Sequence, residues 1–430
     1  MIELSFLILQ VLIFFIFFWI NPLIQNIKEP NQNSLSLSEN ISFNFIIHSN
    51  YILILCILNF NLKEMIIVYL LSIFVIYLFF LKKNFLKIKA LKEVYIFEFI
   101  ILFFISLVIF IDISNKLILS WDAEKFWLSK TLNFYNEFSI DNLKNVARPH
   151  YPFLGNLLNS FYWKLSFINY EYSGRLIFGF IYCLALILLV NNLLLSKTFK
   201  LIFLILLLFI TYDYPLILSG NQEILIFSII CIVMNSFYKI KINKKNILKH
   251  LIIIFLSCNL LIWIKQEGIF YSFFLIFTLF FILKLNFKQK FFYILTVIIF
   301  LSIKLFVFKF YNLEISLNKS VISSLAPYDL LMKISFDRIF LLLKYLFFAP
   351  FQSYFLLCGI IFYILNRIFK TKIDYLNFYI LINFLFIFSV YLFIDNQEFN
   401  LKTGIDRLIF NISPFIIILL VEIVNNKNKN

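Results

Sequence analysis

The feature that most constrains this chain is a long succession of apolar runs. A helix needs roughly 20 apolar residues to cross a bilayer, and a water-soluble domain does not carry such runs in series. We therefore predict an all-α polytopic membrane protein with about 13 transmembrane helices. The predicted spans are 3–24, 42–61, 65–81, 94–114, 175–195, 201–218, 223–238, 250–265, 268–285, 291–310, 351–371, 375–394 and 408–424.

The composition agrees with this class of protein, since 62% of the 430 residues are hydrophobic and only 14% are charged. The net charge of +15 does not indicate a nucleic-acid partner. Lys and Arg gather in short connections between the apolar runs, which is the pattern that fixes membrane orientation. The five Cys residues lie in apolar runs without a CxxC pattern, and the three His residues are far apart. We expect neither disulfides nor a metal site.

The basic connections fall at every second position from residue 81 onward and predict which side is cytoplasmic. They are 81–92, 196–200, 239–245, 284–290, 366–372 and the tail 425–430. The segments that should face outward are 115–174, 219–223, 265–268, 311–350 and 395–407. These outward segments hold most of the polar residues of chemical interest, so we expect a functional site on the outer face.

The longest outward segment, 115–174, begins with SWDAEKFW, in which Asp122 and Glu124 stand between two tryptophans. We predict a helix over 122–138 that lies on the outer leaflet, because aromatic residues favour the membrane–water interface. Asp122 is the N-cap of this helix, a carboxylate that takes a proton from an incoming acceptor, or both, since a capped carboxylate is also a positioned one. Glu124 is either a second catalytic acid or a solvated acid in the first helical turn.

The motif RPHYP follows at 148–152 and holds Arg148, His150 and Tyr151 between two prolines. One interpretation is a rigid turn with exposed polar residues, and the other is a substrate-positioning loop. A second interfacial helix is predicted over 328–349, in the outward segment 311–350.

Four more ionisable residues stand beside outward turns: Glu223 in SGNQE, Lys265 and Glu267 in IKQEG, and Arg407 in DRLIF. Ionisable groups bordered by apolar runs are costly and often functional, so we predict that all four bind substrate. Arginine geometry suits a phosphate clamp. The alternatives are a first-turn acid for Glu223, a polar hairpin for 265–268, and snorkelling of Arg407 with Asp406 as the N-cap.

The order of WDA-x₃-W, RPHYPFL, SGNQE, IKQEG and DRLIFNISP over residues 94–424 resembles the bacterial GT-C membrane glycosyltransferases. These include relatives of the dolichyl-phosphate-mannose protein mannosyltransferases and of the aminoarabinose lipid A transferase. The resemblance implies a ten-helix core in the bacterial inner membrane, with a large first outer loop that carries interfacial helices. Residues 1–93 would be added N-terminal helices, and 425–430 a cytoplasmic tail.

The resemblance also implies a chemistry. A polyprenyl-phosphate-linked sugar would be the donor, and a lipid, a glycan or a protein would be the acceptor on the outer face. Asp122 would be the general base, while Lys265 and Arg407 would meet the donor phosphate. Some relatives use a divalent cation, but this sequence offers no convincing set of ligands for one.

Two other classes of protein fit the same composition. An enzyme of the O-antigen polymerase or ligase type is also polytopic, but its large loop comes late in the chain, whereas here the longest loop comes early. A lipid-linked sugar flippase or another transporter should carry charges in mid-bilayer, in interrupted helices. In this chain most of the candidate residues stand at outer helix ends, which favours surface chemistry.

Overall fold

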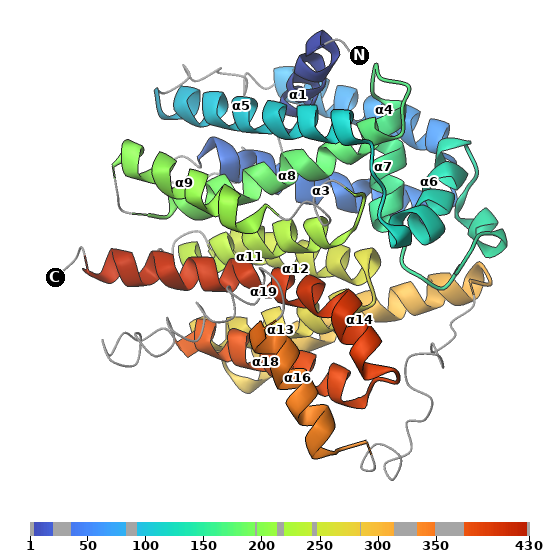
Figure 1. The fold of residues 1–430 in the computed structure, drawn as a ribbon. Helices are drawn as coiled ribbons and strands as arrows, with labels where there is room; N and C mark the ends of the chain where they lie inside the picture. The colour runs from blue at the N-terminus through green and yellow to red at the C-terminus, as the bar shows by residue number, and fades with distance from the viewer. Residues whose placement is uncertain are drawn as a thin grey trace.

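The structure is a computed structural model that describes residues 4–19, 36–82, 93–193, 196–212, 219–242, 247–283, 285–313, 333–348 and 374–427. These residues form helices and connections, with no strand among them (Figure 1). Seven helices are long and apolar enough to cross a membrane. They are α3 (Leu37–Ile57), α5 (Glu93–Lys116), α8 (Tyr172–Asn191), α11 (Glu223–Ile242), α12 (Ile247–Ile264), α14 (Phe287–Phe310) and α18 (Asp374–Phe393).

The remaining elements are α1 (Leu4–Trp19), α4 (Leu62–Lys82), η1 (Ala123–Trp127), α6 (Leu128–Tyr135), η2 (Ile140–Asn145), α7 (Leu154–Lys164), α9 (Lys197–Thr211), α13 (Glu267–Ile282), α16 (Phe336–Phe348) and α19 (Gln397–Lys427). Every predicted span overlaps one of these helices except 351–371, which lies outside the described residues. The predicted all-helical class is therefore confirmed for the part of the chain that the structure describes, and its seven candidate spans are consistent with a polytopic protein. The count of about 13 spans stays a prediction.

The helices form a bundle whose two ends differ in chemistry. Figure 1 shows η1 and α6 near one end and the C-terminus at the other. We call the first the outer end; it also carries the turns before α11 and between α12 and α13. The second, the basic end, carries the turn between α8 and α9 and the lysine-rich end of α11.

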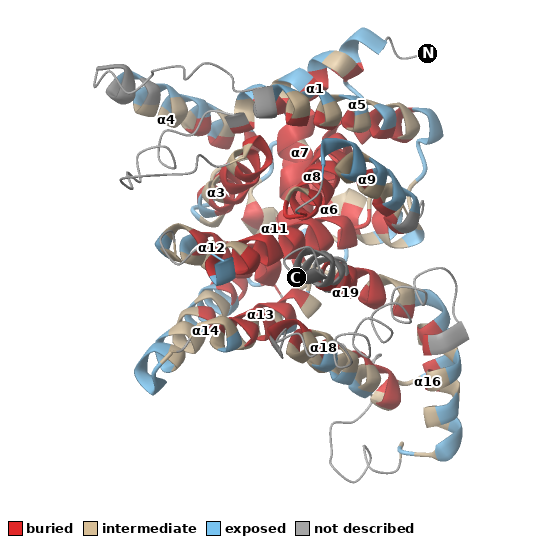
Figure 2. Ribbon diagram, turned by 90° about the vertical axis from the view of Figure 1, so that its left-hand side faces the viewer, coloured by how far each residue is buried: buried red, intermediate tan, exposed pale blue. Residues whose placement is uncertain are grey.

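Helices α8 and α11 form the centre of the bundle. All of the apolar window of α8 and 94% of that of α11 are buried, against 22% for α14 (Figure 2). The two central helices pack on each other, and α5, α12 and α19 pack around them. Helices α1 and α3 share the same core. Phe14 of α1 contacts Phe110 of α5 and Phe180 of α8, and α3 packs on α8 and α12. Helices α1 and α3 are thus packed against the rest of the bundle, whereas α4 remains largely exposed.

Several helix boundaries follow from local capping chemistry. Ser36 and Glu39 form a capping box at the start of α3, and Asn286 and Gln289 do the same for α14. Asn59 and Asn312, which follow α3 and α14, adopt positive φ angles of 67° and 53°. Asparagine tolerates the left-handed region better than most residues. Each of these two helices therefore ends just before an asparagine that can adopt this conformation.

The predicted outer segments contain more helix than the sequence suggested. In 115–174, the helical stretch ends at Tyr135 instead of 138, and Phe134 is buried in the bundle rather than spread on its surface. The segment also contains the buried helix α7, which was not predicted. Its 11 residues are too few for the length criterion that identified the spans.

The last predicted span also begins earlier than expected. Helix α19 starts at Gln397, so Asp406 lies inside a helix and the predicted N-cap at Asp406 is wrong. Pro414 lies within the same helix and cannot donate to the carbonyl of Phe410. Ser413 Oγ donates to that carbonyl at 2.7 Å and satisfies it instead. This compensation lets the helix continue through the proline.

The second predicted interfacial helix, 328–349, is described only over residues 333–348, where α16 occupies Phe336–Phe348. Arg338 joins α16 to the end of α18, since its Nε donates to the carbonyl of Leu392 at 3.0 Å. Gln397 of α19 donates to the carbonyl of Arg338 at 2.9 Å. Helix α16 is therefore packed on α18 and α19.

The orientation predicted from the basic connections can be tested by labelling introduced cysteines. We expect Asn136→Cys to react with an impermeant maleimide on intact cells, and Lys288→Cys to react only after permeabilisation. Both positions are exposed, and the background should lack the native Cys residues. Labelling of Lys288→Cys on intact cells, with protection of Asn136→Cys, would reverse the orientation.

Candidate functional site at the outer end

Four ionisable side chains meet at the outer end of the bundle. Arg407 Nη1 forms an ion pair with Asp122 Oδ2 and lies 3.7 Å from Glu223 Oε1. Lys265 Nζ donates to the same Glu223 oxygen at 2.7 Å. The network thus joins the residue that precedes η1 to residues from α11, the α12–α13 turn and α19, and its first and last members are 285 positions apart.

The four side chains differ in exposure. Glu223 is 1% exposed and Lys265 is 14% exposed, whereas Asp122 and Arg407 are 27% exposed. Two cations and two carboxylates balance, which removes the large cost of an unpaired buried charge. The network therefore runs from a buried carboxylate to a pair that remains accessible at the surface.

Asp122 does not cap a helix, so the capping interpretation is wrong. Its backbone is already helical and its side chain makes no capping hydrogen bond. Ser120 takes that role, because its Oγ accepts from the N–H of Ala123 at 3.2 Å. The rings of Trp121 and Phe126 pack on each other beside it, with centroids 5.3 Å apart. The Asp122 carboxylate is thereby free to reach Arg407.

Asp122 directly precedes a π-helical turn, η1, in place of the regular helix that we predicted. The N–H of Leu128 donates to the carbonyl of Ala123, five residues earlier. Such single wide turns inside helices are rare and frequently occur at functional sites.

The turn before α11 holds Glu223 beside η1. The N–H of Ser120 donates to the carbonyl of Ser219 at 2.9 Å, and Ser120 Oγ donates to Asn221 Oδ1 at 2.8 Å. Gly220 has a φ of +79° in this turn, and a Cβ there would lie 3.3 Å from Ala123 Cβ. Both the backbone conformation and the close approach therefore favour glycine.

Arg175 fixes the chain just before η1. Its Nη1 donates to the carbonyl of Ile118 at 2.9 Å, and its Nε pairs with Glu171 at 3.0 Å. Arg175 is only 4% exposed. A buried guanidinium thus ties the start of α8 to the end of the α5–η1 connection, which positions Asp122 indirectly.

Lys265 lies in the tight connection between α12 and α13. A Cβ on Gly268 would fall 1.9 Å from the carbonyl oxygen of Leu261, so only glycine permits this approach of the two helices. Burial acts to lower the pKa of Lys265, but the carboxylates of Glu223 and Glu267 outweigh it and raise that pKa. Lys265 therefore remains a cation at neutral pH.

The other predicted site residues lie outside the network. Glu124 is exposed and pairs with Lys125 at 3.5 Å, so it is placed as a solvated acid. Arg148, with a φ of 50°, lies over the Phe126 ring at 4.2 Å and donates to the Tyr151 hydroxyl. His150 packs against the ring of Tyr151. Glu267 is half-buried at the start of α13.

RPHYP forms a turn, with the N–H of Tyr151 donating to the carbonyl of Arg148 at 3.0 Å. Its polar side chains are half-buried rather than exposed, and a role in positioning substrate stays a prediction. The turn forms a wall beside η1 through Phe126 and Trp127, whose centroids lie 6.1 and 6.0 Å from that of Tyr151. Its side chains border the site without joining the ion network.

Sequence reasoning missed three residues that build the site: Ser120, Asn221 and Arg175. Arg175 carried a usable signal, because an arginine at the start of a predicted span is costly unless it has a partner. Ser120 and Asn221 carried none, because their hydrogen bonds join segments that are 101 positions apart.

Glu223 was predicted to bind substrate, but the structure does not place it on the accessible side of the site. It is buried and serves as the shared counterion of Lys265 and Arg407. Within the described ranges, no three His, Cys, Asp or Glu side chains lie close enough to hold a metal ion. No step is therefore assigned to a metal.

The buried pair of Lys265 and Glu223 should dominate the stability of this end of the bundle. Lys265→Met removes one partner of a buried pair and should lower the free energy of unfolding by about 3 kcal/mol. Adding Glu223→Gln should restore part of the loss. Thermal melting in detergent measures both. Lys402→Met is the matched control, since the exposed pair of Lys402 and Glu398 should contribute little; equal effects of the two lysine changes would contradict the assignment.

Comparison with protein-family models, with curated proteins and with solved structures gives no match for this chain. The resemblance to GT-C transferases therefore remains a prediction from short motifs. The geometry of the four-residue network is the basis for a functional proposal.

Proposed function

We propose that the protein is an integral-membrane glycosyltransferase that moves a sugar from a polyprenyl-phosphate donor to a lipid, glycan or protein acceptor on the outer face. The observation that carries this proposal is the convergence of Asp122, Glu223, Lys265 and Arg407 at one end of the bundle. Two cations and an accessible carboxylate are the groups that transfer from a lipid phosphate requires.

The donor phosphate is the leaving group, so it needs charge stabilisation rather than protonation. Arg407 is suited to this, because a guanidinium has five N–H donors in a planar fork. Among the described residues, only its Nη1 contacts carboxylates. Its remaining donors are available to phosphate oxygens, while Glu223 holds the guanidinium in place from the buried side.

The acceptor hydroxyl or amine needs orientation and a proton acceptor. Asp122 Oδ2 is held by Arg407, and no described residue donates to Oδ1. The acceptor would donate to Oδ1, which brings the acceptor oxygen or nitrogen beside the site of the donor phosphate. Loss of the phosphate from the sugar and attack of the acceptor then occur around one ion pair.

The surroundings suit a lipid-linked substrate. Trp121 is 63% exposed and Phe138 is 50% exposed, both within the first outer segment. Exposed aromatic residues favour headgroup height in a bilayer, where a polyprenyl carrier presents its phosphate. The flippase alternative would instead favour charges midway along interrupted helices, whereas three of the four network residues stand at helix ends or in connections.

Asp122→Asn tests the role of the carboxylate. It keeps the size of the side chain but removes the proton acceptor, so we expect turnover to fall roughly 10²–10⁴-fold. The measurement is sugar transfer by purified protein in nanodiscs, with a panel of polyprenyl-phosphate sugars. Glu124→Gln, two positions away and solvated, is the control that should keep full activity. An Asp122→Asn protein that melts normally and transfers sugar at the wild-type rate would remove Asp122 from the mechanism.

Arg407→Lys tests the phosphate clamp. Lysine keeps the positive charge but loses the planar fork, so kcat should fall roughly 10²-fold as developing charge on the phosphate loses a donor. The same transferase assay measures it, with Lys402→Arg on the exposed face of α19 as the control. Full activity of Arg407→Lys would show that charge alone suffices at this position.

A further inference from the structure

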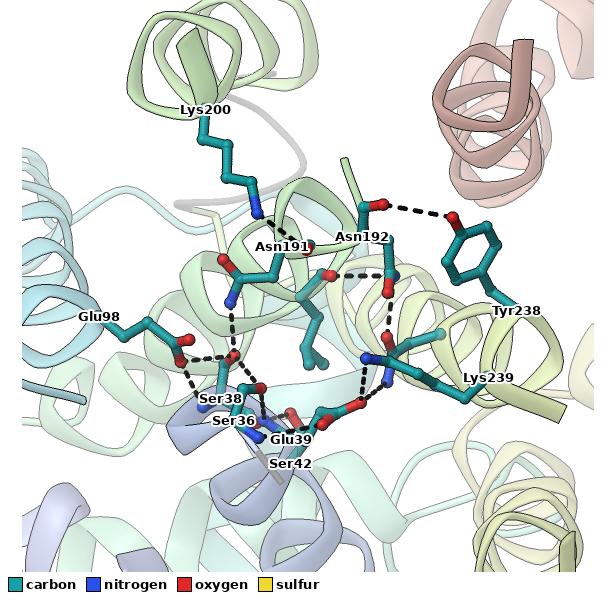
Figure 3. Close-up of polar contacts among 12 residues, drawn as sticks. Ser36, Ser38, Glu39, Ser42, Glu98, Asn191, Asn192, Lys200, Tyr238 and Lys239 are labelled. Carbon is teal, nitrogen blue, oxygen red and sulfur yellow. Dashed lines mark hydrogen bonds and ion pairs between the residues drawn. The ribbon is translucent and has the colours of Figure 1, made fainter. Parts of the chain in front are cut away.

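The basic end of the bundle contains a cavity of about 310 Å³ that the proposed reaction at the outer end does not use. Its lining comes from five helices, α3, α5, α8, α9 and α11, with polar contacts that Figure 3 draws. The helices that build it are therefore the same ones that form the core, but the site lies at their opposite ends.

One carboxylate in this cavity, that of Glu39, already has partners at both of its oxygens. Glu39 Oε1 accepts from Asn235 Nδ2 at 3.1 Å and pairs with Lys239 at 3.3 Å. Its Oε2 accepts from the N–H of Ser36 at 3.1 Å. Glu39 therefore serves the packing of α3 against α11 and has little capacity left for a ligand.

The second carboxylate, that of Glu98, accepts hydrogen bonds from the described residues at only one of its two oxygens. Its Oε2 accepts from both the N–H and the hydroxyl of Ser38, each at 3.0 Å (Figure 3). No residue of the described chain donates to Oε1, although Glu98 is only 6% exposed. Glu98 lines the cavity, so its Oε1 can accept a hydrogen bond from a ligand that carries a donor.

Two lysines complete the cavity on its more exposed side. Lys197 and Lys200 lie in the first turn of α9, and no carboxylate of the described residues forms an ion pair with either. Lys200 Nζ donates to the carbonyl of Asn191 at 3.1 Å (Figure 3), which leaves two of its three N–H groups for other acceptors. The N-terminus of α9 adds the positive end of a helix dipole. This side of the cavity therefore attracts an anion.

The cavity is bordered by surfaces that suit acyl chains. Helix α5 exposes Ile96 and Ile100 close to Glu98, and α9 exposes Phe199 and Ile202 close to Lys200. In a helix predicted to span the membrane, such exposed apolar side chains meet lipid. A ligand held between α5 and α9 can thus keep its head group in the cavity and its chains in the bilayer.

We propose that this cavity binds the head group of an anionic phospholipid of the inner leaflet, with the phosphate at Lys197 and Lys200 and a head-group hydroxyl donating to Glu98 Oε1. Basic pockets between helices on the cytoplasmic side are a known form of lipid-specific recognition. The proposal is independent of the transferase reaction, since it shares no side chain with the outer network.

Native mass spectrometry of the detergent-purified chain, titrated with short-chain phosphatidylglycerol, tests the proposal. Lys197→Gln and Lys200→Gln should each weaken binding about fivefold, the loss expected per basic side chain at an anionic lipid surface. Lys288→Gln is the matched control, because Lys288 is an exposed lysine of the basic end outside the cavity. Equal losses in all three variants would reduce the effect to general charge and overturn the site.

Two further experiments distinguish a bound lipid from a free phosphate ester and test the contact with the head group. Soluble glycerol 3-phosphate should compete poorly with the lipid; competition at equal concentration would show that the cavity takes a free phosphate ester and not a lipid. Glu98→Gln should keep the contacts with Ser38 and reduce the preference for phosphatidylglycerol over phosphatidic acid, which lacks the head-group hydroxyl. An unchanged preference, in a variant that melts like the wild type, would contradict the contact at Glu98.

Discussion

The outer end of this protein depends on the neutralisation of one buried carboxylate. Glu223 is almost fully buried at the start of α11, and an isolated charge in that position would cost several kcal/mol. Lys265 and Arg407 remove this cost by pairing with Glu223, and Arg407 also pairs with Asp122. The same charge balance that stabilises the fold thus brings together the four groups that the proposed reaction uses.

This arrangement explains why the connections at the outer end are so closely fitted. Gly220 allows the turn before α11 to touch η1, and Gly268 allows α12 and α13 to meet at the turn that holds Lys265. Arg175 anchors the chain before η1 through the carbonyl of Ile118. Each contact limits the freedom of one member of the network, which is the preorganisation that electrostatic catalysis requires.

The two ends of the bundle handle charge differently. At the outer end cations and carboxylates are matched, and the accessible pair is Asp122 with Arg407. At the basic end Lys197 and Lys200 form no direct ion pair among the described residues, and Glu98 accepts hydrogen bonds from them at Oε2 alone, both from Ser38.

The sequence by itself determined the class of architecture and the candidate residues. Apolar runs of spanning length predicted the helices because a bilayer imposes one length scale on every span. Ionisable residues beside apolar runs indicated Glu223, Lys265, Glu267 and Arg407 because such groups are costly there, and the position of Asp122 between two tryptophans indicated that carboxylate. The tertiary structure alone decided their partners. That Asp122 meets Arg407 rather than capping its own helix, and that Glu223 lies buried between two cations, depends on contacts between segments far apart in the chain, and no local pattern of residues encodes them.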